Sequence, residues 1–168
     1  QLPSQLAEQL ALQIAAVSAN DGRSPRQVLN ELMREDNPPD LSYADFFTVV
    51  PLQLEMQGPP ALLIYSNADE QQGILCRSNN CPAWVYRVVG GHYERLLSTS
   101  SGYYGIRLQA NRAHGLNDIE VYQHGSAASG GLTLWRFDGH RYRERQCWSV
   151  DYPNDADTPR KTPAPCGR

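Results

Sequence analysis

The feature that most constrains the fold of this chain is a phrase that occurs twice. Residues 85 to 94 read VYRVVGGHYE and residues 134 to 143 read LWRFDGHRYR, so Tyr86 and Trp135 occupy equivalent places 49 positions apart. In each phrase a glycine-containing pair separates two strand-like runs, which is the signature of a two-residue β-hairpin. The repetition therefore predicts two similar hairpins, with Gly90-Gly91 and Asp138-Gly139 as their turns.

The similarity continues before each hairpin, where the sequence indicates a strand, a turn and a second strand. These second strands end in Tyr65-Ser66-Asn67 and Tyr122-Gln123-His124, at an offset of 57 positions. The larger offset fits an insertion in the first unit that holds Cys76 and Cys81. A period near 50 residues with four strands per unit is typical of propeller-like blades, but two blades cannot close a ring. We expect a mainly β (α+β) fold of about eight antiparallel strands, made of two repeated four-strand units arranged like propeller blades or a sandwich.

The N-terminal part of the chain carries a helical pattern. Four apolar residues recur at helical spacing within residues 4 to 18: Leu6, Leu10, Ile14 and Val17. A second helix begins at a capping box, with Ser24 as N-cap, Pro25 as the first helical residue and Gln27 as its partner. Its buried face is expected to hold Val28, Leu29, Leu32 and Met33. The predicted organisation is a helical pair over residues 1 to 40 and a duplicated β domain over residues 41 to 168, ending in a disulfide-closed tail.

The charge and hydropathy of the chain exclude two classes of partner. The 168 residues carry a net charge of −3, and 15 basic residues are scattered among 18 acidic ones, so no nucleic-acid footprint is present. No run approaches the roughly 18 apolar residues of a membrane span. The chain begins with Gln1 and lacks an initiator Met, which indicates a shortened chain or a mature product after removal of a signal peptide.

The four cysteines form two local pairs along the sequence, Cys76 with Cys81 and Cys147 with Cys166. Of three possible disulfide connectivities, pairing of neighbours is favoured, because it closes loops that have little core of their own. Two disulfides would imply an oxidising compartment, so we expect a periplasmic or secreted protein. A zinc site is the alternative, but the second pair is too widely spaced for a ligand knuckle.

The second unit resembles the degenerate FG-GAP-type repeat of many secreted or periplasmic bacterial proteins. That pattern joins a Gly-x-x-Asp-hydrophobic strand, a His-Ser-Ala stretch and an aromatic-x-(Phe/Tyr)-Asp-Gly-x-x-Tyr hairpin. The matching segments here are GLNDI at 115 to 119, HGSA at 124 to 127 and WRFDGHRY at 135 to 142. The resemblance covers residues 60 to 150 and leaves the predicted helices outside.

Some proteins of this general type resemble periplasmic lysozyme inhibitors and immunity proteins against peptidoglycan-degrading toxins. Those inhibitors insert a Ser-Gly-x-x-Tyr loop into the lysozyme cleft. Here Ser101, Gly102, Tyr103 and Tyr104 lie between the two units, although Tyr104 comes one position early and Gly105 stands where the motif has its Tyr. The resemblance implies that these four residues bind a protein partner. The neighbouring polar residues His124 and Ser126 are added as partner-binding residues.

We therefore expect a protein that performs no catalysis and neutralises a lysozyme-like toxin by occluding its active site. The acidic net charge suits a basic partner through electrostatic steering. The alternative is a non-enzymatic periplasmic binding or scaffold module for a small ligand, a metal ion or an envelope component. An enzyme is not favoured, because no group of residues satisfies the geometric requirements of a catalytic site.

Each proposed binding residue also has a structural interpretation. Residues 101 to 104 would then form a turn between units followed by a strand with one buried Tyr. His124 and Ser126 would belong to a polar loop that hydrogen-bonds the backbone, since the Gly-x-Ser-x-Gly elbow of a serine hydrolase is missing.

No cofactor or metal is expected. Asn67-Ala68-Asp69-Glu70 and Asn117-Asp118-x-Glu120 stand where intact FG-GAP repeats carry calcium loops, but neither stretch alternates its acids as a calcium loop does. The equivalent arginines of the two hairpins, Arg87 and Arg136, are expected to lay their stems over aromatic rings on the outer side of the sheet.

Overall fold

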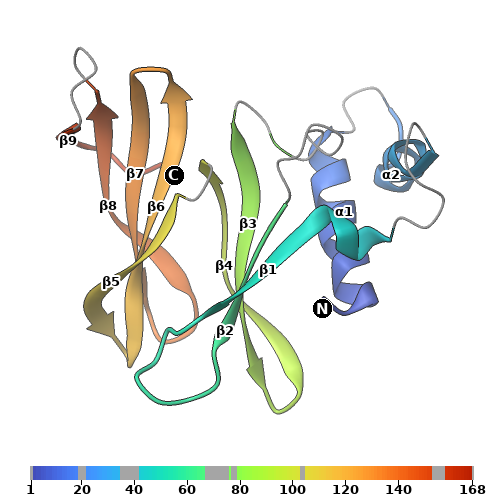
Figure 1. The fold of residues 1–168 in the computed structure, drawn as a ribbon, viewed down its shortest axis with the longest axis horizontal. Coiled ribbons are helices and arrows are strands. Elements are labelled where there is room, and N and C mark those ends of the chain that lie inside the picture. Colours follow the sequence, from blue (N-terminus) through green and yellow to red (C-terminus); the bar gives the residue numbers. More distant parts are fainter. Residues whose placement is uncertain are drawn as a thin grey trace.

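The computed structural model describes residues 2–18, 22–34, 42–66, 76, 79–102, 105–152 and 158–167. These residues form three layers in a row: a helical pair, a four-stranded sheet and a five-stranded sheet (Figure 1). The mainly β class, the antiparallel strands in two units and the N-terminal helical pair are thereby confirmed.

Both sheets are antiparallel and their strands follow one another in sequence order. The first sheet contains β1 (Phe47–Leu52), β2 (Ala61–Ser66), β3 (Asn80–Val89) and β4 (His92–Gly102). The second contains β5 (Ile106–Ala113), β6 (Leu116–Ser126), β7 (Ser129–Phe137), β8 (Tyr142–Asp151) and β9 (Arg160–Ala164). The helices are α1 (Ser4–Ser18) and α2 (Pro25–Arg34), and a short 3-10 helix, η1 (Tyr43–Phe46), leads into β1.

The strand registers confirm that the two sheets are equivalent units. Val49 pairs with Ile64 in the first sheet, and Ile106 pairs with Val121 in the second, so both partners are displaced by 57 positions. This is the offset seen between Tyr65 and Tyr122 in the sequence. The first two strands of each unit therefore match residue for residue at that point.

The second hairpins match at the smaller offset, down to an irregularity. The β3–β4 register slips by one residue between Val85 and Tyr86, and the β7–β8 register slips between Leu134 and Trp135, 49 positions later. A β-bulge adds one unpaired residue to a strand and increases its twist. The bulge thus stands at the same place in both hairpins, as the repeated phrase in the sequence predicts.

The turns of the two hairpins were only partly predicted. Gly90 and Gly91 form the β3–β4 turn with φ angles of 56° and 81°, which suit glycine. In the β7–β8 turn, Asp138 N–H donates to Arg141 O at 3.0 Å, so the central residues are Gly139 and His140. The expected Asp138-Gly139 pair lies in this turn, but the centre is one residue later, and the Asp138 carboxylate also closes the turn by accepting from His140 N–H and Arg141 N–H.

The helices form as expected and cover one face of the first sheet. The capping box is present: Gln27 N–H donates to Ser24 Oγ at 3.2 Å, and Ser24 N–H donates to Gln27 Oε1 at 2.8 Å. The core beneath them joins apolar residues of α1, α2, β1, β2 and β3, among them Leu10, Leu29, Phe47, Ile64 and Trp84. Of the predicted helix-face residues, Val17, Leu32 and Met33 have side chains outside the described part.

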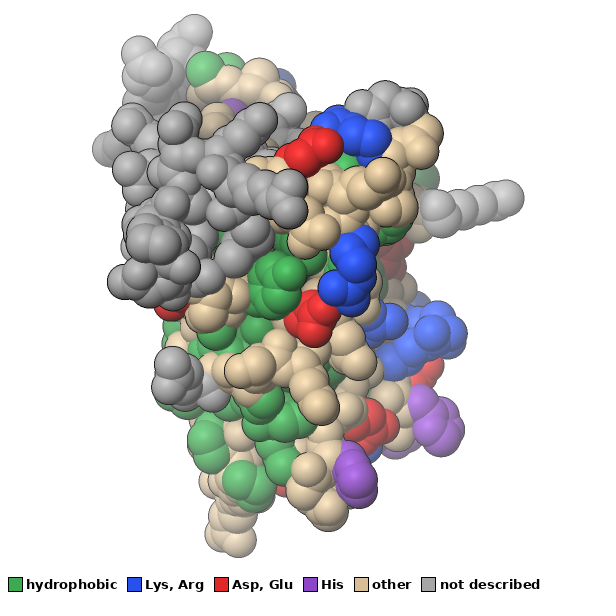
Figure 2. Space-filling model, turned by 90° about the vertical axis from the view of Figure 1, so that its right-hand side faces the viewer, with side chains coloured by type: hydrophobic (Ala, Val, Ile, Leu, Met, Phe, Trp, Pro, Cys, Tyr) green, Lys and Arg blue, Asp and Glu red, His purple; other side chains and the backbone are tan. Residues whose placement is uncertain are grey.

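On the side of the helices, basic and acidic side chains alternate on the surface (Figure 2). Arg26 of α2 forms an ion pair with Glu8 of α1 at 2.9 Å, and Arg23 pairs with Glu31. Exposed pairs of this kind contribute little stability, because water and salt screen them. The buried apolar stripe of α1 therefore holds the helices in place.

A second core joins the two sheets. It combines Leu63, Val85 and Leu97 of the first sheet with Ile119 and Phe137 of the second. Polar contacts reinforce it, since Gln123 Nε2 donates to Ser100 O at 2.9 Å and Asn117 N–H donates to Leu54 O at 2.9 Å. The sheets are thus fixed against each other by apolar burial and by hydrogen bonds.

The fifth strand of the second sheet was missed in the sequence. β9 lies antiparallel to β8, with Val150 opposite Lys161 and Trp148 opposite Pro163. Pro163 donates no backbone hydrogen bond, which suits the edge position of β9, and this strand also carries cations that discourage further pairing. The C-terminal tail, expected to be only a disulfide-closed loop, therefore contributes the edge of a sheet.

Candidate functional site

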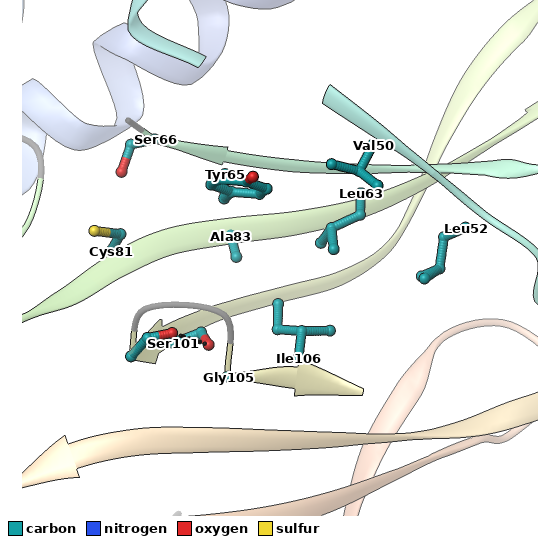
Figure 3. Close-up of a pocket in the computed structure, with 11 residues that line it drawn as sticks. Val50, Leu52, Leu63, Tyr65, Ser66, Cys81, Ala83, Ser101, Gly105 and Ile106 are labelled. Carbon is teal, nitrogen blue, oxygen red and sulfur yellow. Dashed lines mark hydrogen bonds between the residues drawn. The ribbon is translucent and has the colours of Figure 1, made fainter. Parts of the chain in front are cut away.

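An apolar pocket lies where the first sheet faces the start of β5 (Figure 3). Its volume is about 460 Å³. The lining residues are Val50, Leu52, Leu63, Tyr65, Ser66, Cys81, Ala83, Ser101, Gly102, Gly105 and Ile106, and none of them is charged. A cavity of a few hundred Å³ with apolar walls and few polar groups is the usual form of a small-molecule site.

Strand alternation and residue size produce this pocket. Leu63 and Tyr65 project from β2 on the face opposite Ile64, which lies in the core under the helices. Ala83 stands opposite Tyr65 on β3, and its single methyl group leaves space in the wall. Ile106 points across from β5 toward Ala83 and Leu63 (Figure 3). The first sheet thus supplies most of the wall and β5 closes it.

The connection between β4 and β5 forms the end of the pocket and requires glycine. Gly105 N–H donates to Gly102 O at 2.8 Å. A Cβ on Gly105 would lie 2.6 Å from the carbonyl oxygen of Tyr122, and one on Gly102 would lie 3.2 Å from the Tyr122 ring. Glycine at positions 102 and 105 therefore allows the chain to lie this close to β6.

The two pocket serines have already committed their hydroxyl protons. Ser101 Oγ donates toward Gly102 O at 2.9 Å, with Tyr122 O at 3.3 Å. Ser66 Oγ lies 3.5 Å from Cys76 Sγ, and since that sulfur belongs to a disulfide, the serine is the donor. Both oxygens keep free lone pairs, so the pocket offers hydrogen-bond acceptors to an occupant.

The structure places the predicted partner-binding residues in different surroundings. Ser101 and Gly102 are buried at the end of β4 and line the pocket. Tyr103 and Tyr104 lie outside the described residues. The burial of Ser101 follows from the β3–β4 pairing, which extends to the last residue of β4, opposite Asn80. That residues 101 to 104 bind a protein partner remains a prediction.

His124 and Ser126 lie on the far end of β6. His124 is half-buried, and its backbone N–H and C=O bond the side-chain amide of Asn80, both at 2.7 Å. Ser126 is exposed, and its Oγ accepts from Ala128 N–H at 3.3 Å and lies 2.8 Å from Ser129 Oγ. Ser126 thus bonds the backbone as the structural interpretation has it, whereas His124 is held through its own backbone. Both residues belong to strand β6 and not to the expected polar loop.

Asp118 and Arg136 of the second unit form an ion pair in which the carboxylate is buried. Asp118 is 0% exposed, and its carboxylate accepts three hydrogen bonds of 2.7 to 3.2 Å from the Nε and NH2 groups of Arg136. This bond raises the pKa of Arg136. The carboxylate directs the guanidinium of Arg136, and the position of the Arg136 stem over an aromatic ring stays a prediction.

The other predicted cation and calcium residues have separate roles. The Arg87 guanidinium lies 5.7 Å from the centre of the Phe137 ring and also bonds Glu94 at 2.7 Å. A contact of Arg87 with an aromatic ring is thereby confirmed, but the expected outer side of the sheet is wrong, because the ring belongs to the second sheet. Glu120 lies 3.9 Å from Lys161. The stretch Asn67 to Glu70 lies outside the described residues.

Asp138 and Tyr142 lock the β7–β8 hairpin. The carboxylate of Asp138 accepts from Arg141 N–H, His140 N–H and Arg143 Nε, and these bonds hold its pKa well below the usual range. Tyr142 is buried, and its hydroxyl donates to Asn117 O at 2.7 Å. Desolvation and the nearby Asp118 carboxylate raise the pKa of Tyr142 far above its usual value.

The cysteines pair as predicted, and none is free. Cys76–Cys81 borders the apolar pocket, to which Cys81 contributes. Cys147–Cys166 ties the tail beyond β9 to β8. With all four thiols in disulfides, the zinc alternative is excluded.

Sequence reasoning did not find the pocket. Its residues come from five strands and from a connection at the end of β4, so no local motif marks them. The small residues Ala83, Gly102 and Gly105 were the available signal, but small residues indicate a cavity only once the strand pairing is known.

Within the described parts of the chain, neither helix has the length and apolar character needed to cross a bilayer. Comparison of the chain with protein-family models, curated proteins and solved structures found no match.

Proposed function

We propose that this chain is an extracytoplasmic binding protein that holds an apolar ligand in the pocket between its two sheets. The observation that carries the proposal is the cavity of about 460 Å³, walled by apolar side chains from both sheets. The two disulfides support a location outside the reducing cytoplasm. No catalytic step is needed for this function.

The chemistry of the wall narrows the ligand class. A carboxylate or an ammonium group would have to leave water without an opposite charge, because no lining residue is charged. Ser66 and Ser101 can accept a hydrogen bond, but their protons are already in use. The preferred ligand is therefore neutral and apolar, with at most a hydroxyl or amide donor at the serine end.

A titration with Nile red, a neutral apolar dye that fluoresces strongly out of water, tests the proposal. We expect saturable binding with a Kd on the order of 10 μM or tighter. Val50, 36% exposed on the edge strand β1, lines the pocket, so Val50→Glu should place a charge in the wall and weaken binding at least about tenfold.

Val88→Glu is the matched control, since Val88 is 43% exposed near the β3–β4 turn and away from the pocket. It should bind Nile red like the unchanged protein. Absence of saturable binding, or equal loss in the two variants, would show that the pocket is not the binding site.

A second function has support from the anchoring of the segment that precedes Tyr103. The hydrogen bond from Gly105 N–H to Gly102 O joins the two ends of the connection, and Ser101 Oγ bonds to Gly102 O and Tyr122 O. A loop that occludes an enzyme cleft needs such fixed ends, because ordering a free loop on binding costs affinity. The connection of residues 102 to 105 therefore suits an inhibitor or immunity protein directed against a lysozyme-like hydrolase.

Turbidity loss of a peptidoglycan suspension measures this activity. The unchanged protein should slow a basic lysozyme, and the double variant Tyr103→Ala, Tyr104→Ala should not. Tyr93→Ala, at a residue 41% exposed in the β3–β4 hairpin, is the control and should inhibit normally. Failure of the unchanged protein on muramidases and lysozymes, or loss of inhibition in the control as well, would argue against the inhibitor.

A further inference from the structure

A second cavity lies between the sheets, separate from the apolar pocket in all of its lining residues. It has a volume of about 540 Å³. Its walls come from β4, from β7, from the β7–β8 hairpin and from the C-terminal tail: Arg95, Leu96, Leu97, Ser98, Trp135, Arg141, Tyr142, Arg143, Glu144 and Gly167. We call it the arginine groove.

The groove carries an excess of positive charge on a protein whose net charge is −3. Of its three guanidinium groups, that of Arg143 bonds Asp138 at 3.0 Å. The guanidinium of Arg95 points to the helical layer, since it donates to Gln13 Oε1 of α1 at 3.3 Å and Arg95 stands opposite Tyr86, which lies in the core under the helices. Arg141 has no side-chain bond to a described residue. Glu144 is the one acid in the wall. Arg141 therefore lines the groove without an acidic partner among the residues described.

The remaining wall is aromatic and apolar. Trp135 and Tyr142 stand beside Leu96 and Leu97, all four of which line the groove. The indole N–H of Trp135 is buried and has no acceptor among the described residues, although most buried donors have one. Such a donor favours an occupant that brings an acceptor oxygen to this wall.

From these features we propose that the arginine groove binds a small organic anion, with its carboxylate or phosphate on Arg141 and the indole N–H of Trp135 and its ring or chain against Leu96 and Leu97. Guanidinium groups match the geometry of both oxyanions. The proposal concerns a different site and a different ligand chemistry from the neutral pocket, so either can fail without the other.

The test follows the indole N–H signal of Trp135 in ¹⁵N-labelled protein during titration with three probes. Glucuronate supplies a carboxylate on a ring, inorganic phosphate supplies the other oxyanion, and glucose is the neutral counterpart of glucuronate. We expect saturable shifts with glucuronate or phosphate, with a Kd on the order of 1 mM that weakens at high salt, and none with glucose. The probe that binds more tightly identifies which oxyanion the groove prefers.

Two variants locate the binding. Arg141→Gln should weaken anion binding at least about fivefold, and Arg145→Gln should not, because Arg145 is an exposed cation of β8, four residues after Arg141, that does not line the groove. Thermal melting of Arg141→Gln should be unchanged, since its exposed side chain forms no hydrogen bond or ion pair with a described residue. The proposal is overturned if neither anion gives a saturable shift, if glucose shifts the signal equally, or if Arg145→Gln loses as much affinity.

Discussion

At the scale of single residues, the two units differ most clearly where one carries a buried charge and the other does not. Asp118 is 57 positions after Ala61, and Arg136 is 49 positions after Arg87. The two residues of the ion pair in the second unit therefore correspond to an alanine and an arginine in the first unit. Arg87, without that carboxylate, bonds Glu94 and the Phe137 ring instead. The same backbone positions thus hold different contacts because one side chain changed.

Removal of Arg136 and removal of Asp118 should lower the free energy of unfolding by different amounts. Arg136→Ala leaves the fully buried Asp118 carboxylate without its cation, a situation that costs on the order of 3 kcal/mol. Asp118→Ala restores the residue of the first unit and leaves Arg136, whose side chain is 39% exposed, in contact with water. Urea unfolding should show the greater loss for Arg136→Ala, and a greater loss for Asp118→Ala would refute this account of the pair.

The stabilising effect of Asp138 should depend on pH in one direction. Its hydrogen bonds to Arg141 N–H, His140 N–H and Arg143 lower its pKa in the folded state below the ordinary value of 3.8. A lowered pKa stabilises the fold fully above the unfolded value, and this stabilisation is lost as pH falls through the folded one. The melting temperature of Asp138→Ala should therefore lie below that of the unchanged protein by the same margin near pH 7 and near pH 5, and the margin should shrink below about pH 3.8. A margin that stays constant down to about pH 2 would contradict this.

At the scale of elements, the hairpins and helices could be predicted because their signals are local. The capping box of α2 and the glycine turn of the first hairpin each depend on residues within four positions of one another. The centre of the β7–β8 turn lies one residue later than predicted, where Asp138 bonds Arg141 through both its backbone N–H and its carboxylate. The ninth strand was missed because β9 depends on pairing with β8, and proline-containing residues 160 to 164 have no strand pattern of their own.

Neighbouring glycines in β7 should tolerate alanine differently. A Cβ on Gly130 would lie 2.6 Å from both Gln123 O and the Tyr122 ring, whereas a Cβ on Gly131 would meet nothing within 4 Å. Gly130→Ala should destabilise by about 1–3 kcal/mol through the forced shift of β6, and Gly131→Ala should change stability by less than about 0.5 kcal/mol. Urea unfolding of both variants measures the difference; equal effects would mean that β6 and β7 lie further apart.

At the scale of the whole molecule, equivalent faces of the two sheets point in the same direction along the row of layers. Ile64 of the first sheet points to the helices, and its equivalent Val121 points to the first sheet. The helical pair therefore covers the first sheet as the first sheet covers the second. The pocket and the arginine groove both form where the two equivalent sheets meet.

The repeat in the sequence could predict the two sheets, but not the space between them. Register and turn chemistry are encoded within each unit, whereas the cavity depends on which faces meet and where side chains such as Ala83 leave a gap. The predicted residues Ser101 and Gly102 do reach the pocket, as part of its buried wall, while His124 and Ser126 do not line it.

The most direct measurement of the central claim, that a neutral apolar ligand binds between the sheets, is a map of contacts to a bound probe. Protein labelled at the methyl groups of Ile, Leu and Val should be saturated with decanol, and intermolecular nuclear Overhauser effects recorded. The account predicts contacts to the methyl groups of Val50, Leu63 and Ile106, which line the pocket from three strands. Contacts confined to the exposed Val88 and Val89, or none at all, would contradict it.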